Sequence, residues 1–516
     1  MGALSGHPRG LYMLFFAEMW ERFSYYGMRA LLVLYMTQGF LKFPDKNAFA
    51  VYGAYTSLVY ASPIIGGLLA DQILGYRRAI ILGGTLMAAG HLLMTQENSY
   101  LFFTALALII CGNGFFKPNI SSLVGKLYGD GDPKRDAGFT IFYMGINLGA
   151  GLAPILCGIA ADYFGKTTVV DGKEVIEKAF HYGFGLATIG MIMGLIVFTL
   201  GQNVLGDKGL PPNREKLAKW GIPIYVSSIV IAPMIALLLQ YGSFVGYLLI
   251  GFGILTLSSL IALALKEEKV PRQRMFLIFI LMFFHMIFWA FFEQAGSSLT
   301  LFAERNVNRS ILGREIPTAT LQAVNPVFIW VFGPLLASLW VSLANKKKDP
   351  AAPFKFGLGI FQLGLGFGVI WLSTLLADSS GKTMLPFLIL GYLGHTTGEL
   401  CISPVGLSTV TKMAPVRIVG LMMGAWFLSN AFANYLAGMI AALTGVEEGG
   451  GKSAEAASAV ESLAVYGDVF GKIAVSAFVV ALLCLIMAPF LTKMMHLDKL
   501  ARDPNEHLTD VHEELA

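Results

Sequence analysis

Charge is scarce in this sequence of 516 residues, since Asp, Glu, Lys and Arg make up 14% of it and apolar or aromatic residues make up 55%. A water-soluble fold of this size could not coat its surface with so few charged side chains. The net charge is only +4, and the basic residues lie in short segments between apolar runs. The long basic surface that a nucleic-acid partner requires is therefore absent. We expect an all-α polytopic membrane protein that binds no nucleic acid.

Cysteine is rare, and the common nucleotide-binding and hydrolase motifs are missing. The four cysteines lie within apolar runs at unrelated spacings, at Cys111, Cys157, Cys401 and Cys484. This pattern argues against a disulfide framework and a CxxC metal site. No GxxxxGKS/T, GxSxG or HExxH segment is present, so the sequence gives no support to an ATP-driven pump, a serine hydrolase or a zinc protease. We therefore expect no enzyme activity, no metal and no cofactor.

Apolar runs of one characteristic length recur along the whole chain. A bilayer core about 30 Å thick is crossed by about 20 helical residues. The runs predict fourteen transmembrane helices, near 11–40, 48–71, 78–96, 99–124, 137–161, 180–203, 220–241, 244–265, 274–303, 318–344, 355–377, 384–412, 416–443 and 467–495. Because this number is even, both termini should lie on the same side of the membrane.

The basic residues of the loops indicate which side that is. Most of them fall in loops that share the side of the termini: Arg77 and Arg78, Lys134 and Arg135, Arg214 to Lys219, Lys266 to Arg274, and Lys346 to Lys348. Opposite loops such as 304–317 and 444–466 carry fewer basic residues. The positive-inside rule therefore predicts a multi-pass protein of the plasma (inner) membrane with both termini in the cytoplasm.

Weak internal repetition divides the chain into two halves. Three segments recur in the same order: GGLLAD at 66–71 as GPLLAS at 333–338, Lys117-Pro118 as Ser403-Pro404, and RDAG at 135–138 as RIVG at 417–420. Such repeats are typical of transporters built from two six-helix bundles. The helix pair at 220–265 is then an insertion. The predicted domains are an N-terminal bundle at 1–203, a linker with a transmembrane hairpin at 204–273, a C-terminal bundle at 274–495 and a cytoplasmic tail at 496–516.

Charged residues inside the apolar runs are few and regularly spaced. A charge at the bilayer centre costs at least about 2.5 kcal/mol, so it normally faces a polar cavity and is paired there. In the first predicted helix one polar stripe at three- and four-residue steps comprises Glu18, Arg22, Tyr25 or Tyr26, and Arg29, with Glu21 beside it. Lys117, Glu293 and Glu399 add one charge each from three other helices.

Structural ion pairs could explain any one of these charges. They do not explain why both halves direct carboxylates and cations toward one interior. A central cavity that is cationic beside the first helix and anionic beside the helix that carries Glu399 would suit a zwitterion. Carboxylates placed near Arg or Lys in such a cavity can also exchange a proton.

Several motifs resemble those of one transporter family. EMWERFSYYG at 18–27 matches the pattern ExxERFxYYG, and further matches are GGLLADQILG at 66–75 followed by Arg77 and Arg78, GFFKPN at 114–119 and FTIFYMGINLG at 139–149. In these motifs the sequence resembles the proton-dependent oligopeptide transporter (POT) family of the major facilitator superfamily. The resemblance implies the major facilitator fold, with 220–265 as the two-helix insertion of bacterial members. It also implies a symporter driven by the proton gradient that imports di- and tripeptides by alternating access.

The resemblance also implies roles for single residues. It assigns proton coupling to Glu18, Glu21, Arg22, Lys117 and Glu293. Peptide binding falls to Arg29 and Lys117 for the carboxylate, Glu399 for the amino group, Asn147 and Asn325 for the backbone, and Tyr25, Tyr26, Tyr60, Trp289, Ser403 and Trp426 for side-chain pockets. For each of these aromatic residues, core packing is the alternative. Apart from the resemblance, the expected place of Asp71, Arg77 and Arg78 in a cytoplasmic turn favours a latch of the inner gate or a role in topology over substrate binding.

Other functions stay open at the level of sequence. Relatives on the same scaffold can carry nitrate or other anions, but these substrates need no acid such as Glu399. Drug antiport, a membrane enzyme and a structural protein are further alternatives. Unlike some relatives, the predicted second helix at 48–71 has no histidine, so coupling cannot depend on one there. The expected partners are peptides, protons and the lipid bilayer, and the sequence does not determine the oligomeric state.

Overall fold

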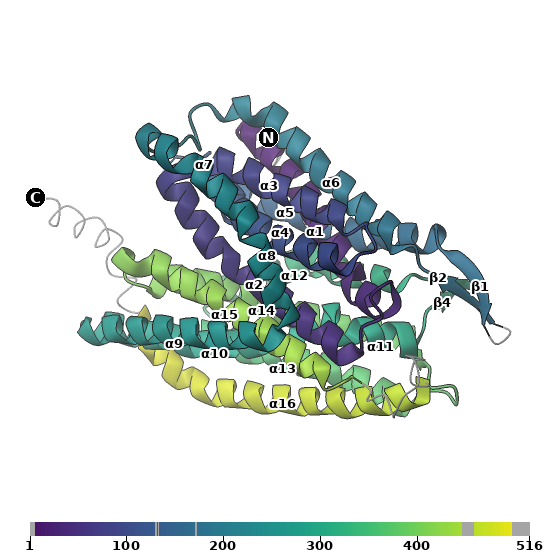
Figure 1. Cartoon of the computed structure of the whole chain (residues 1–516). Coiled ribbons are helices and arrows are strands. Elements are labelled where there is room, and N and C mark those ends of the chain that lie inside the picture. The colour runs from purple at the N-terminus through teal and green to yellow at the C-terminus, as the bar shows by residue number, and fades with distance from the viewer. Residues whose placement is uncertain (1–5, 130–131, 133, 171–172, 446–458, 498–516) are drawn as a thin grey trace, which may run out of the picture.

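The structure is a computed structural model that describes residues 6–129, 132, 134–170, 173–445 and 459–497. Eleven helical stretches within this part are long and apolar enough to cross a membrane. Helices α1 (Arg9–Gln38), α3 (Tyr76–Leu93) and α14 (Leu385–Met413) complete the predicted fourteen spans. Figure 1 shows them as two neighbouring groups, one purple to blue and one green to yellow. The predicted all-α membrane fold is confirmed.

The N-terminal half consists of the first six spans. Besides α1 and α3 it contains α2 (Asp45–Leu69), η1 (Ala70–Leu74), α4 (Ser99–Gly125), α5 (Arg135–Tyr163), α6 (Phe180–Gly201) and η2 (Gln202–Leu205). Helix α1 packs against α5 and α6, and the charged residues of its polar stripe are buried. Gly75 (φ 72°) makes the turn from η1 into α3, where a β-carbon would lie 2.6 Å from the backbone of Leu210.

The inserted hairpin consists of α7 (Arg214–Val230), α8 (Ala232–Gln240) and α9 (Gly242–Lys266). Helix α7 begins six residues before the predicted boundary because the side chain of Asn213 accepts a hydrogen bond from the Lys216 amide (2.9 Å) and caps it. Helix α8 contacts α2 and α4, whereas α9 contacts α2, α10 and α15. The hairpin therefore touches both halves.

The C-terminal half follows the hairpin. It comprises α10 (Lys269–Phe292), η3 (Glu293–Gly296), α11 (Ser298–Asn306), η4 (Thr318–Ala323), α12 (Val324–Asn345), α13 (Ala352–Leu375), α14, η5 (Val416–Ile418), α15 (Val419–Ala442) and α16 (Ala459–Met494). Of the predicted tail at 496–516, residues 498–516 lie outside the described part of the chain.

The single helix predicted over 274–303 is wrong, because α10 ends at Phe292 and a short 3-10 turn separates it from α11. At this break the Ser297 hydroxyl donates to the Glu293 carbonyl (3.3 Å), and the Ser298 hydroxyl donates to the Gln294 side chain (2.7 Å). Hydroxyl groups that bond locally compete with regular helical hydrogen bonds. The break places Glu293 at the end of α10, in the interior.

Short strands were not predicted and occur outside the membrane spans. Strands β1 (Lys166–Val170) and β2 (Lys173–Glu177) pair antiparallel. Two further pairs are β3 (Val307–Asn308) with β6 (Thr383–Met384), and β4 (Ser310–Ile311) with β5 (Arg314–Glu315). β1, β2 and β4 lie at the right of Figure 1, away from the end of α16. We call this the outer end, and the end that holds the start of α1 and the end of α16 the terminus end.

The two halves meet through close helix contacts. Helix α2 crosses α15 where Gly53 faces Gly438, and a β-carbon on Gly53 would lie 2.8 Å from the Cα of Gly438. Glycine on both sides thus permits a backbone approach that a larger residue would prevent. Helix α5 also contacts η4 and α12. The interior residues of the two halves are brought together between these contacts.

Candidate functional site

The first group of site residues lies on one face of α1. The Arg22 side chain bonds to Glu21, and its Nε lies 3.1 Å from Glu18 Oε1. All three side chains are buried, and one oxygen of each carboxylate has no hydrogen-bond partner. A buried carboxylate oxygen without a partner is costly, and a proton would lower that cost. Glu18, Glu21 and Arg22 of the predicted cluster are therefore in contact, and their role in proton coupling stays a prediction.

Lys117 on α4 stands close to this cluster without joining it by an ion pair. Its Nζ lies 4.5 Å from the centre of the Tyr60 ring, on α2. Within the described residues no carboxylate lies within ion-pair distance of Lys117, although Glu18 and Glu21 are near enough to act on it electrostatically. Arg22, on the same helix as both acids, already occupies them. Contact between Lys117 and the α1 acids, implied by the family resemblance, is not made in this structure.

The second group joins the two halves. Arg29 on α1 forms a buried ion pair with Glu293, which follows α10. The Nε of Arg29 also donates to the hydroxyl of Tyr52 on α2 (2.7 Å). Sequence reasoning missed Tyr52, although it precedes Tyr60 by eight residues in the same apolar run and so lies near the same helix face. Arg29 is thus held by one anion and one hydroxyl in the interior.

The third group surrounds Glu399 on α14. Its Oε2 accepts a hydrogen bond from the Asn325 side chain on α12 (2.8 Å), and Asn325 also donates to Thr396 (3.0 Å). Glu399 is 8% exposed, and no cation pairs with it within the described part of the chain. Glu293 is close enough to Glu399 to interact with it electrostatically. An acid without a cationic partner thus faces the same interior as Arg29.

The aromatic residues implied for side-chain pockets divide into two sets. Tyr26, Tyr60 and Trp289 are partly exposed, whereas Tyr25 and Trp426 are 2% and 1% exposed. Tyr25 and Trp426 therefore pack within the walls in this structure. The remaining polar residues of the predicted site are Asn147, which donates to the Tyr143 carbonyl (3.0 Å), and Ser403, whose buried hydroxyl has no partner.

His285 connects the two tryptophans. The Trp289 indole donates to His285 Nε2 (2.9 Å), and His285 Nδ1 lies 3.0 Å from the Ser429 hydroxyl. Ser429 in turn donates to the Trp426 carbonyl (2.7 Å). The centroids of the Trp426 ring and the imidazole lie 4.3 Å apart. These contacts match a neutral imidazole that accepts at Nε2 and donates at Nδ1. His285 therefore fixes the orientation of the partly exposed Trp289.

Of the predicted gate residues, Asp71 lies in η1, directly after α2, whereas Arg77 and Arg78 lie in the first turn of α3. Asp71 accepts a hydrogen bond from Tyr76 (2.5 Å), and Arg78 is exposed. Arg77 donates to the carbonyls of Lys208 (2.7 Å) and Gly206, just before the hairpin. The start of α3 is thus tied to the linker through Arg77, and Asp71 bonds to Tyr76 instead of to Arg77 or Arg78.

Two ion pairs at the outer end join the halves and were not predicted. Asp45 at the start of α2 pairs with Arg305 in α11 through two contacts of 2.5 and 2.8 Å. Lys178, before α6, pairs with Glu304 in α11 (2.5 Å). Both pairs are largely shielded from solvent, with side chains between 10% and 18% exposed. Consecutive residues of α11 thus hold two different segments of the N-terminal half.

Metal binding gains no support from the described residues, among which no three His, Cys, Asp or Glu side chains form a group that could hold an ion. The expectation of no cofactor stays a prediction.

Comparison with known proteins gives consistent matches over almost the whole chain. The model of the POT family matches residues 77–454. Dipeptide and tripeptide permease B of Xenorhabdus bovienii (strain SS-2004) is 36% identical over 493 residues, which cover 95% of this chain and 96% of the permease. The crystal structure of a peptide transporter POT in complex with sulfate shares 37% identity and a TM-score of 0.79, covering 96% of this chain and 97% of that one.

A third match is a POT family transporter crystallised with 5-aminolevulinic acid, with 31% identity, a TM-score of 0.79 and coverage of 95% and 98% of the two chains. These relatives are permeases and transporters, not enzymes, and they share the fold described above. The resemblance seen in the motifs is confirmed, and this chain belongs to the POT family of membrane transporters.

Proposed function

We propose that this protein is a proton-coupled symporter that imports di- and tripeptides. The observation that carries the proposal is the placement of Arg29 from one half and Glu399 from the other in a shared interior, where Arg29 is held by an acid and Glu399 lacks a cation. A zwitterionic peptide has a carboxylate for a cation and an ammonium group for an acid. Relatives that are dipeptide and tripeptide permeases support the same substrate class.

The peptide would lie between the halves. Arg29 and Lys117 would bind its carboxylate, Glu399 its ammonium group, and Asn147 and Asn325 its backbone. Partly exposed aromatic walls, to which Tyr26, Tyr60 and Trp289 contribute, would accept many side chains because they offer apolar contact without a fixed hydrogen-bond pattern.

Proton coupling would act through the ion pair of Arg29 and Glu293. Protonation of Glu293 removes its charge and weakens its attraction for Arg29, which becomes available to the peptide carboxylate. The cluster of Glu18, Glu21 and Arg22 is a second place where a proton can bind, because two of its oxygens lack partners. Binding of both a proton and a peptide would then favour the closed state that leads to the inward-facing one, which neither ligand favours alone.

In alternating access, the outer end would close when the inner end opens, and the reverse. The halves that move would be residues 1–203 and 274–495, with 204–273 as the hairpin between them. The pairs Asp45–Arg305 and Lys178–Glu304 hold the halves together at the outer end, as an inward-facing state would require. The excess of basic residues in the loops of the terminus end supports an orientation with both termini in the cytoplasm. Arg77 and Asp71 would then act at the inner end.

Counterflow tests this function. Liposomes that contain the protein and unlabelled dialanine should take up labelled dialanine saturably, and an outside-acid pH gradient should drive net uptake into empty liposomes. Uptake that is not saturable, or that ignores the gradient, would refute the proposal. Saturable nitrate uptake without peptide uptake would identify an anion carrier instead.

Replacement of Glu399 by Gln should weaken the binding of dialanine by about tenfold or more, since a hydrogen bond to a charged group contributes about 1.5–3 kcal/mol. Competition against a labelled peptide measures this change. N-acetylated dialanine has no ammonium group, so the wild type and Glu399→Gln should bind it equally. Unchanged dialanine affinity in the variant would exclude Glu399 from the amino-group role.

A further inference from the structure

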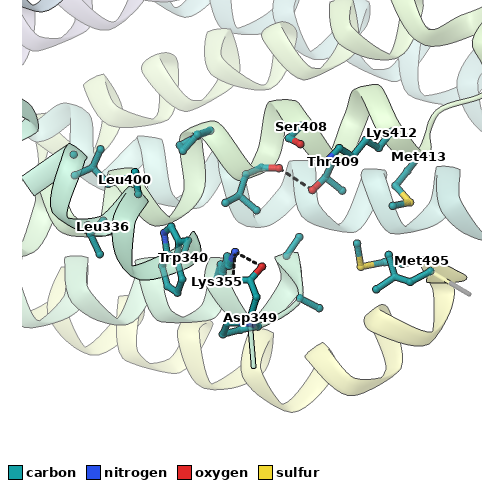
Figure 2. Close-up of a pocket in the computed structure, with 18 residues that line it drawn as sticks. Leu336, Trp340, Asp349, Lys355, Leu400, Ser408, Thr409, Lys412, Met413 and Met495 are labelled. Atoms are coloured by element: carbon teal, nitrogen blue, oxygen red, sulfur yellow. Dashed lines mark hydrogen bonds and ion pairs between the residues drawn. The ribbon is translucent and has the colours of Figure 1, made fainter. Parts of the chain in front are cut away.

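A cavity lies in the C-terminal half at the terminus end. It has a volume of about 780 Å³ and is lined by the later parts of α12 and α14, the start of α13 and the end of α16. Figure 2 shows Leu336 and Leu400 toward one end of it and Lys412, Met413 and Met495 toward the other. None of the residues assigned above to peptide or proton binding lines it. The cavity is therefore distinct from the transport site.

The part of the cavity deeper in the membrane is apolar. Its walls are Gly333, Leu336 and Ala337 of α12 and Leu400 and Pro404 of α14. Between Leu400 and Lys412, helix α14 advances about 18 Å at 1.5 Å per residue. One leaflet of the bilayer core is about 15 Å deep, half of about 30 Å. The cavity thus has the length of an acyl chain that runs from the membrane surface toward the bilayer centre.

The part nearer the membrane surface is charged. Lys355 is 8% exposed, pairs with Asp349 (2.8 Å) and lies 4.5 Å from the centre of the Trp340 ring. Lys412 is exposed and forms no ion pair within the described residues. One carboxylate therefore faces two cations, and Lys346 to Lys348 follow directly after α12. The surface end of the cavity carries an excess of positive charge.

The hydroxyl group of Thr409 in the cavity wall needs no partner from a bound molecule. Thr409 donates to the Val405 carbonyl of its own helix (2.7 Å). A peptide in this cavity would leave its backbone groups without partners along the apolar part. A molecule with one anionic head and an apolar tail matches both parts. Basic residues near a membrane surface attract anionic lipids, at about 1 kcal/mol for each Lys or Arg.

We propose that this cavity binds a phospholipid with an anionic headgroup from the leaflet at the terminus end. The phosphate lies at Lys412 and beside the Lys355–Asp349 pair, and one acyl chain follows Leu336, Gly333 and Leu400 between α12 and α14. Zwitterionic lipids lack the net charge that the excess cation requires. This site does not depend on the proposed transport function, because lipid binding can be measured without transport.

The experiment uses the full-length protein in nonionic detergent with added dioleoyl phosphatidylglycerol or dioleoyl phosphatidylcholine. Bound lipid is counted by native mass spectrometry, and stability is followed as the midpoint of thermal unfolding. Lys412→Gln removes the unpaired cation, and Lys493→Gln removes an exposed lysine on α16 that does not line the cavity. Gly333→Leu fills the apolar part, since a β-carbon there would touch only Leu400, at 3.9 Å.

Phosphatidylglycerol should bind to the wild type and to Lys493→Gln and raise their unfolding midpoints, whereas phosphatidylcholine should not. Lys412→Gln should bind it about fivefold more weakly, and Gly333→Leu should lose it. If Gly333→Leu does not fold, Ala337→Leu fills the same part. Equal binding of both lipids, full binding by the filled variant, or equal stabilisation by soluble glycerol phosphate, which would indicate a free-phosphate site, would each overturn the proposal.

Discussion

With Gln in place of Glu293, the protein should still exchange dialanine across a membrane but should no longer accumulate it under a proton gradient. Glu293 and Arg29 form the buried ion pair between the halves. At an effective dielectric constant of about 20, two opposite unit charges 4 Å apart attract one another by about 4 kcal/mol, so protonation of Glu293 substantially weakens its attraction for Arg29. Gln resembles the protonated acid and cannot release a proton.

The effect is large and can be read from one pair of assays. One pH unit is worth about 1.4 kcal/mol for each proton, which allows about tenfold accumulation for each coupled proton. Glu293→Gln should reduce accumulation to none while counterflow continues. Glu268→Gln, at the exposed start of α10, should behave as wild type. Full accumulation by Glu293→Gln would move the coupling to Glu18 or Glu21.

Loss of the Asp45–Arg305 pair should open the outer end. Truncation of one partner in a shielded, hydrogen-bonded charge pair costs about 2–5 kcal/mol. Because Asp45 and Arg305 belong to different halves, the cost applies to states in which the outer end is closed. Asp45→Ala should therefore shift the population toward outward-facing states by about 30-fold, which corresponds to about 2 kcal/mol.

Pulsed electron paramagnetic resonance can measure this shift between spin labels at Tyr100 and Leu376, which are exposed at the outer end on opposite halves. The partly exposed native Cys111 would be replaced first. The label distance should lengthen in Asp45→Ala and stay as in the wild type in Asp468→Ala, which breaks an exposed pair on α16. Identical distances in Asp45→Ala and the wild type would show that the pair does not close the outer end.

The double swap of Asp45→Arg with Arg305→Asp adds an internal check. It restores opposite charges, but Asp45 lies in the first turn of α2 and Arg305 in the last turn of α11. Each native charge therefore favours the dipole of its own helix, and each swapped charge opposes it. In the double swap, the label distance should therefore lie between that of Asp45→Ala and that of the wild type.

Features governed by the membrane could be predicted from the sequence. The cost of polar backbone in lipid forces helices of bilayer length, so the fourteen spans and the hairpin follow from apolar runs. Because a charge inside the membrane is costly, Arg29, Glu293 and Glu399 could be predicted to lie in a polar interior. Glu18 and Arg22 are one turn apart on α1, so their contact was also accessible.

Features governed by local hydrogen bonds or by contacts between distant segments could not be predicted in this way. The break after Phe292 depends on the hydroxyls of Ser297 and Ser298, which also occur inside unbroken helices. Whether Lys117 pairs with Glu18 and Glu21 depends on its competition with Arg22, which already binds both acids. The pair of Asp45 and Arg305 joins two helix ends 260 positions apart, where charged residues are common. The β1–β2 hairpin was overlooked although an Asp-Gly pair separates two β-branched runs there.

Simultaneous measurement of peptide and proton entry tests the central claim of coupled uptake most directly. Liposomes that contain the protein and a pH-sensitive dye would receive labelled dialanine from outside at equal initial pH, with the membrane potential held inside-negative. Coupled transport predicts that the lumen acidifies when peptide is added, in proportion to the peptide that enters, and that neither happens without the protein. Peptide entry without acidification would contradict it.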